Sequence, residues 1–161
     1  MERNGYVIQY IDNPSEDVQL TAVKQHSFAI QFIDNPTEAV QLIAVKDYVH
    51  IIEHIDNPSE VVQLIAVKQF GDVIKYINNP SEAVQLIAVQ QDPFAIQYIK
   101  NPSETIQIAA VKQNGSVIKY IKEPSEAVQI AAIEQDPSCV FYTKNPEMIK
   151  LAESIFKNSI S

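Results

Sequence analysis

The chain is poor in the residues that carry most enzyme chemistry and most covalent crosslinks. Its 161 residues include one cysteine, three histidines and three glycines. A single cysteine, Cys139, cannot form an intramolecular disulfide, which favours a reducing compartment, so we expect a cytoplasmic protein. The sequence holds no glycine-rich phosphate loop, no cysteine pair and no Ser-His-Asp set. It therefore predicts a protein that is not an enzyme and that needs no cofactor.

Basic residues are also scarce. Twelve Lys and Arg stand against 20 Asp and Glu, which gives a net charge of −8 and a pI of about 4.8. This balance disfavours a protein that binds nucleic acid by neutralising phosphates, or one that binds an anionic membrane surface. No apolar run approaches the ~18 residues of a membrane helix. The start, MERNGYVIQY, lacks the apolar segment of a secretory signal. The expected partner is therefore another protein.

What the sequence does have is one phrase repeated every 22 residues. The string NPSEVVQLIAVKQ begins at Asn57. Copies with a few substitutions begin at Asn13, Asn35, Asn79, Asn101 and Glu123, and a more divergent copy begins at Asn145. We number the columns of the repeat from 1 at the Asn of NPSE. We expect a single repeat domain over 1–161, with a half repeat at 1–12, full repeats at 13–34, 35–56, 57–78, 79–100, 101–122 and 123–144, and a C-terminal cap with a polar outer face at 145–161.

Proline and glycine divide each repeat into two short segments. Proline fills column 2 in all seven copies, and the other two prolines and all three glycines fall in column 15. The first segment predicts a helix in which column-1 Asn is the N-cap, proline is the first helical residue and column-4 Glu completes a capping box. It should end near column 12. The second segment begins at turns such as Asn4-Gly5 and Asp92-Pro93. It should be short, partly 3₁₀, and end before the next proline.

The apolar pattern indicates how these helices pack. The second helix should bury columns 17, 18 and 21 and turn columns 16 and 19 outward. The first helix is apolar almost all round, as expected when neighbouring repeats cover it on both sides. The string VQLIAV is rich in β-branched residues, so a strand is the alternative, but the Asn-Pro-Ser-Glu start favours a helix. We therefore predict an all-α fold, a right-handed α-solenoid of about seven two-helix repeats.

The repeat also resembles known solenoids. The alternation NPSEAVQLIAVQQDPFAIQYIKNPSE (79–104) resembles the leucine-rich-repeat variant, a short right-handed α/3₁₀ solenoid. The string AVKQNG (110–115) is similar to that of uncharacterised multi-copy α-repeat families. The resemblance covers nearly the whole chain and implies a solenoid fold. It implies no activity, because these families share no catalytic residues that could be carried over.

Two surface features are candidates for binding a partner. The first, the aromatic row, is column 20: Tyr10, Phe32, His54, Tyr76, Tyr98, Tyr120 and Tyr142. These rings should lie half-exposed beside the groove between layers, where they either anchor a partner or simply pack. The second, the acidic ridge, comes from columns 22 and 4 of the first three repeat junctions: Asp12, Glu16, Asp34, Glu38, Asp56 and Glu60. The ridge is either a solvated face or a site for a basic protein, with nucleic-acid mimicry as one form.

Charge also changes along the chain. Column 22 reads Asp12, Asp34, Asp56, Asn78, Lys100, Lys122 and Lys144, and column 19 varies as well.

Column 7, in contrast, is constant in the six full repeats. It forms the glutamine ladder: Gln19, Gln41, Gln63, Gln85, Gln107 and Gln129. We expect these amides to bond neighbouring amides or loop carbonyls, since buried amides must be paired, with a ligand-reading role as the alternative.

One string resembles a metalloprotease motif. His50-Ile51-Ile52-Glu53-His54 spells H-x-x-E-H, with the histidines about one helical turn apart. Both histidines occupy columns that carry aromatic residues in other repeats, and a third ligand is not evident. Aromatic substitution is therefore the preferred interpretation, and we assign no metal site. Cys139 falls in core column 17 and is expected to be a small buried hydrophobe.

Together these features predict a non-enzymatic protein–protein interaction module, an adaptor or an inhibitor, that binds along an extended surface. The alternatives are a nucleic-acid-mimicking inhibitor of a nucleic-acid-processing enzyme, a metal enzyme that uses His50, Glu53 and His54, and a structural part that assembles end to end. The partner, the oligomeric state and the curvature of the solenoid stay open.

Overall fold

The computed structural model describes residues 5–143 and 145–158. In these ranges α-helices alternate with 3₁₀ helices (η), and there is no strand. The α-helices are α1 (Glu16–Gln25), α2 (Glu38–Asp47), α3 (Glu60–Gln69), α4 (Glu82–Gln91), α5 (Glu104–Gln113), α6 (Glu126–Gln135) and α7 (Pro146–Asn158). The 3₁₀ helices are η1 (Gly5–Tyr10), η2 (Ser27–Phe32), η3 (Val49–His54), η4 (Gly71–Tyr76), η5 (Pro93–Tyr98), η6 (Gly115–Tyr120) and η7 (Pro137–Tyr142).

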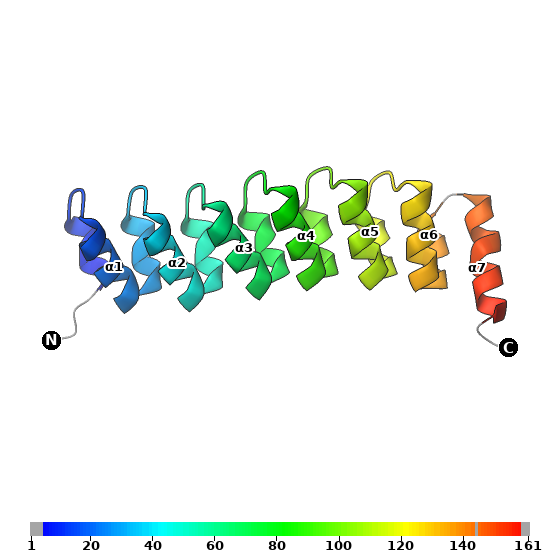
Figure 1. The fold of residues 1–161 in the computed structure, drawn as a ribbon, viewed down its shortest axis with the longest axis horizontal. Helices are drawn as coiled ribbons and strands as arrows, with labels where there is room; N and C mark the ends of the chain where they lie inside the picture. Colours follow the sequence, from blue (N-terminus) through cyan, green and yellow to red (C-terminus); the bar gives the residue numbers. More distant parts are fainter. Residues whose placement is uncertain (1–4, 144, 159–161) are drawn as a thin grey trace.

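The helix pairs stack as an all-α repeat solenoid, which confirms the predicted fold class. Each α-helix packs against the α-helix before and after it, and each η helix packs against its neighbouring η helices. Figure 1 shows the layers in a nearly straight row, with α1 and α7 at opposite ends of the row. The loops that join each η helix to the next α-helix follow one edge of the row (Figure 1). This repetition gives every column of the sequence a line of its own along the molecule.

The predicted helix start is wrong by two residues in α1 to α6. Each of these helices begins at the column-4 glutamate, and its N-cap is the column-3 Ser or Thr, in the extended conformation. In four of them the serine Oγ accepts a bond from the backbone N–H of column 6. The column-1 asparagines instead adopt a left-handed conformation, with φ from 49° to 52° in five copies. Asn tolerates this conformation better than most residues, so it makes the turn that precedes the cap.

The last helix shows the predicted start. Its sequence, NPE, lacks the serine of NPSE, and α7 begins at Pro146. Here the Asn145 Oδ1 accepts a bond from the Glu147 backbone N–H at 3.0 Å, so the asparagine does act as the cap. The choice between the two caps therefore depends on whether column 3 supplies a closer hydroxyl. On its outer side α7 exposes Lys150, Glu153 and Ser154.

The second segment is a full six-residue 3₁₀ helix in every layer. Columns 17 and 18 are buried as predicted in η2 to η6, for example Val73 and Ile74, and column 21 is buried in the five layers from Ile33 to Ile121. Column 15 is buried in five of the seven layers and half-buried at Pro93 and Pro137, which the sequence did not predict. A Cβ on Gly71 would lie 2.4 Å from the carbonyl oxygen of Ala88 in the next layer, so this column sets how closely the layers approach.

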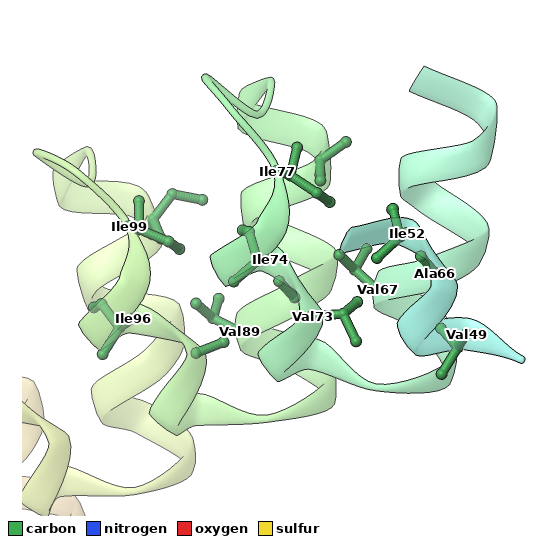
Figure 2. Packing of buried hydrophobic residues seen from close by; sticks show 14 of the residues in the cluster. Val49, Ile52, Ala66, Val67, Val73, Ile74, Ile77, Val89, Ile96 and Ile99 are labelled. Carbon is green, nitrogen blue, oxygen red and sulfur yellow. The ribbon is translucent and has the colours of Figure 1, made fainter. Parts of the chain in front are cut away.

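The core is one continuous strip between the two kinds of helix. Figure 2 shows Val73, Ile74 and Ile77 of the η4 layer lying between Val67 of α3 and Val89 of α4. Columns 6, 10 and 11 of the α-helices are fully buried in the inner layers, as are Val84, Ala88 and Val89 of α4. Column 5, which the sequence assigned to the apolar face, is exposed in α1 to α6. The buried strip holds the η helices rigidly and so positions their outer side chains.

Candidate protein-binding surface

The outer side of the η helices presents the aromatic row. Apart from Val7 in the first layer, columns 17 and 18 are buried or half-buried, while column 20 stays exposed in all layers except that of Tyr76, which is half-buried. Tyr98 is 44% exposed and Tyr120 is 41% exposed. Tyr10 reaches 81%, because no described layer precedes it. The row thus offers aromatic rings, five of them tyrosines that combine an apolar ring with a hydroxyl group, a combination favoured at protein interfaces.

Lysines of column 19 lie against these rings in the C-terminal half. The Lys75 ammonium is 5.0 Å from the Tyr76 ring centre and 5.8 Å from that of Tyr98, and Lys119 is 5.0 Å from Tyr120. Asp72 holds Lys75 at 2.9 Å, and this hydrogen bond raises the pKa of the lysine above its ordinary value. The cation bridges two successive layers of the row and fixes the ring positions.

The N-terminal half carries a wider aromatic cluster. Phe28 contacts Tyr48 and His54, with ring centres 5.3 Å and 6.0 Å apart, and His50 stacks on Phe70 at 5.7 Å. Tyr48 and Phe70 occupy column 14, which the sequence suggested only as a turn, and both are exposed. The signal was present, because column 14 reads His, Tyr and Phe in three consecutive repeats. These rings broaden the aromatic row into a patch over η2, η3 and the start of η4.

The H-x-x-E-H string lies on η3 and contributes to this patch. A 3₁₀ helix has three residues per turn, so positions i and i+4 do not share a face. His50 and His54 accordingly contact different rings, and Glu53 approaches His54 at 3.6 Å. In residues 5–143 and 145–158 no group of three or more His, Cys, Asp or Glu is arranged to hold a metal ion. The expectation that both histidines could meet one ion assumed an α-helical turn and does not hold here.

Recurring pockets lie between the loop edge and the aromatic row. The pocket of about 430 Å³ between the fourth and fifth layers is lined by Lys75, Pro80, Gln85, Tyr98 and Lys100. Equivalent columns line a pocket of about 600 Å³ nearer the N-terminus and one of about 410 Å³ in the next layer. The lining columns are the same in the three pockets, but the charge differs. The N-terminal pocket is lined by Asp12 and Asp34, whereas the pocket between the fourth and fifth layers is lined by Lys100.

The glutamine ladder forms the floor of these pockets. Each of the six side-chain amides donates from Nε2 to the carbonyl of the column-2 proline in its own repeat, at 2.8 to 3.0 Å. The Gln41 Oε1 also accepts a bond from the Ser59 backbone N–H of the next layer. These bonds fasten each Asn-Pro turn onto its helix. One of the two N–H donors of every amide is thus engaged within its own repeat, and the Oε1 atoms of Gln19 and Gln129 are buried, which favours a structural role for the ladder.

The acidic ridge is exposed along its whole length. Its column-4 glutamates do not close capping boxes. Two of them bond forward to the next layer instead: Glu16 accepts from the Thr37 hydroxyl at 2.7 Å and Glu60 from the Ser81 hydroxyl at 2.5 Å. None of the three ion pairs in the described part of the chain involves a ridge residue. The ridge therefore keeps its full negative charge available to solvent or to a partner.

Column 22 reverses its charge along the same edge. Asp12, Asp34 and Asp56 are exposed in the first three loops, Asn78 in the fourth, and Lys100 and Lys122 in the next two. Lys144 and Asn4, which continue columns 22 and 14 in the sequence, lie outside the described residues.

Cys139 is fully buried, and burial raises the pKa of its thiol to about 11.

No protein-family model, curated protein or solved structure matches the chain. The resemblance to the leucine-rich-repeat variant therefore stays a prediction, and the alternation of α and 3₁₀ helices shows only a helical repeat. No helix among the described residues is long and apolar enough to cross a membrane. The features that could bind a partner are therefore the aromatic row on the η helices and the loop edge, where column 22 changes from acidic to basic along the chain.

Proposed function

We propose that the chain is a non-enzymatic protein–protein interaction module, an adaptor or an inhibitor, which binds its partner along the outer side of the η helices. The observation that carries this proposal is the aromatic row, whose rings stay at least partly exposed although columns 17, 18 and 21 of the inner layers are buried. A rigid scaffold that holds a line of amphipathic rings loses little entropy when a partner docks. The partner would lie across several layers, with the pockets accepting its side chains.

The experiment is an affinity pull-down with the wild type and two matched variants. The first replaces Tyr76, Tyr98 and Tyr120 by alanine. The control replaces exposed column-12 residues in the same three repeats, on the α-helical side: Lys68, Gln90 and Lys112. Both variants should keep the circular dichroism spectrum and unfold cooperatively. The tyrosine variant should lose the partner and the control should retain it, whereas retention by a folded tyrosine variant would refute the proposed contact surface.

A second candidate rests on the acidic ridge, whose carboxylates form no ion pair among the described residues. In this candidate the first three layers imitate the charge of nucleic acid and inhibit a nucleic-acid-processing enzyme. Column 22 turns basic at Lys100, which limits such mimicry to the N-terminal half. Reversing the charge of Asp34, Glu38, Asp56 and Glu60 should then abolish binding, and salt or added DNA should displace the partner. Binding that survives high salt favours the aromatic face.

The compartment is part of the same proposal. The single cysteine, buried and held as a thiol, suits a reducing environment, and we place the module in the cytoplasm.

A further inference from the structure

In columns 19 and 22, which lie on the η faces and the loop edge, the charges reverse sign about the middle of the rod, although the loop edge also carries Glu123 beside Lys122 and η4 carries Asp72. Up to residue 56, columns 19 and 22 carry only acidic charges: Asp12, Asp34, Glu53 and Asp56. From residue 75 onward they carry only basic charges: Lys75, Lys100, Lys119, Lys122 and Lys144. The neutral member, Asn78, stands at the centre of column 22. Column 4, in contrast, is glutamate in α1 to α6, so the reversal belongs to this surface and not to the repeat as a whole.

This arrangement complements itself when the rod is turned end for end. A two-fold axis across the rod at the fourth layer sets each column against the same column of a second copy. Asp34 then faces Lys122, Asp56 faces Lys100, and Asn78 faces its own equivalent. A parallel pairing would set Asp against Asp and Lys against Lys. Antisymmetric charge is what an isologous interface requires, because the same patch serves both sides.

The aromatic row obeys the same symmetry. In the antiparallel arrangement Tyr76 meets its own equivalent, His54 meets Tyr98, and Phe32 meets Tyr120, so ring faces ring in every layer. The pockets connect the two features, because each is lined by column 20 and column 22 together. Lys75 lies near the proposed axis, and its own Asp72 at 2.9 Å offsets its charge there. The centre of the contact is therefore not repulsive.

The size of the surface is sufficient for a specific dimer. Seven layers at about 9 Å spacing make a strip about 60 Å long. A contact only about 13 Å wide along that strip would reach the about 800 Å² per partner of a standard interface. The nearly straight row of layers in Figure 1 allows a second rod to follow it over several repeats.

We propose that this face binds a second copy of the chain in an antiparallel homodimer, with a two-fold axis near Asn78. The proposal rests on the proposed function, since it names the occupant of the same interaction surface. The pairs Asp34–Lys122 and Asp56–Lys100 occur twice in the dimer and select the antiparallel orientation. The aromatic row supplies the apolar contact between them.

Sedimentation equilibrium on charge-reversed variants tests the proposal. The basic variant is D34K/D56K, the acidic variant is K100D/K122D, and the inverted variant combines all four changes. The wild type should dimerise, and raising salt from about 50 mM to about 0.5 M should weaken it. The basic and the acidic variant, called the half-reversed variants, should each dimerise at least about 30-fold more weakly than the wild type, because four attractive pairs become repulsive. An equimolar mixture of the two should form a 1:1 heterodimer, and the inverted variant should dimerise again.

Several results would overturn the dimer. They are a wild type that stays monomeric at all accessible concentrations, half-reversed variants that dimerise like the wild type, or a mixture and an inverted variant that both stay monomeric. A Val18→Asp change on the exposed end of α1 is the control for stacking through the rod ends, and loss of the dimer in that variant alone would also refute the proposal. A monomeric wild type leaves the pull-down with tyrosine variants as a separate test, so failure of the dimer and failure of the interaction surface can be told apart.

Discussion

The substitution Gly71→Ala tests whether column 15 sets the spacing of the layers. Two effects oppose each other. Gly71 has no positive φ, so alanine suits its backbone and should stabilise the fold by about 0.4–1 kcal/mol through the unfolded state. Against this, the new Cβ would lie 2.4 Å from the Ala88 carbonyl oxygen and 3.0 Å from the Asp92 backbone N. Reaching an ordinary contact requires the layers to separate by about 1 Å, and backbone atoms cannot rotate away as a side chain can.

Overpacking of this kind costs about 1–3 kcal/mol, so the steric term wins and a net loss of about 1–2 kcal/mol is expected. The assay is urea unfolding followed by circular dichroism. The midpoint urea concentrations of the variants are compared, provided that the dependence of the unfolding free energy on urea, m, is the same in each. Val49→Ala is the matched control, because column 15 already accommodates a side chain there, and its loss should reflect only the methyl groups removed. If Gly71→Ala is neutral or stabilising, the close approach to Ala88 does not limit the packing of the layers.

Three further predictions concern the turns and the core. Gln63→Leu should cost about 1–3 kcal/mol in urea unfolding, because the Pro58 carbonyl loses its 2.8 Å bond in a buried position, and an unchanged midpoint would contradict the role of the ladder. Asn57→Ala should cost about 1 kcal/mol and Asn57→Gly almost nothing, since the residue has φ 52°; equal losses would exclude a left-handed turn. Cys139 should react with a thiol reagent only after unfolding at neutral pH, because its pKa is about 11 in the folded state. The neutral thiol contributes stability that is fully present below its unfolded pKa and is lost as pH rises through about 11, so fast labelling of the native protein at pH 8 would contradict the assigned burial.

The repeat period and most of the buried columns could be predicted from the sequence because they depend on periodicity. Columns 17 and 18 are adjacent, so they share a face whether the helix has 3.0 or 3.6 residues per turn. The H-x-x-E-H string depends on that difference, and the α-helical assumption placed His50 and His54 on one side. The start of the α-helices was missed because Asn-Pro-Ser-Glu holds two good capping residues. The comparison with α7, whose column 3 lacks a hydroxyl, indicates that the column-3 serine or threonine decides between them.

The candidate site was likewise predicted only in part from the sequence. The half-exposed position of column 20 followed from its angle to the buried face, so the aromatic row could be drawn from the sequence. The contribution of Tyr48 and Phe70 was missed, although column 14 reads His, Tyr and Phe in three consecutive repeats, because the pattern predicted a turn there and only the stacked layers bring column 14 beside column 16. Likewise, the sequence showed the charge reversal in column 22, but not that these residues share a loop edge with pockets beneath it.

Oxidative footprinting of the bound chain tests the central claim most directly, since it maps the covered surface whichever molecule covers it. Each side chain is compared with itself in the free monomer. The account predicts that Tyr98 and Tyr120 lose labelling on binding a partner or a second copy, while the exposed Val61 of α3 keeps it. Protection of Val61 with unchanged labelling of both tyrosines would place the contact on the α-helical side and contradict the account.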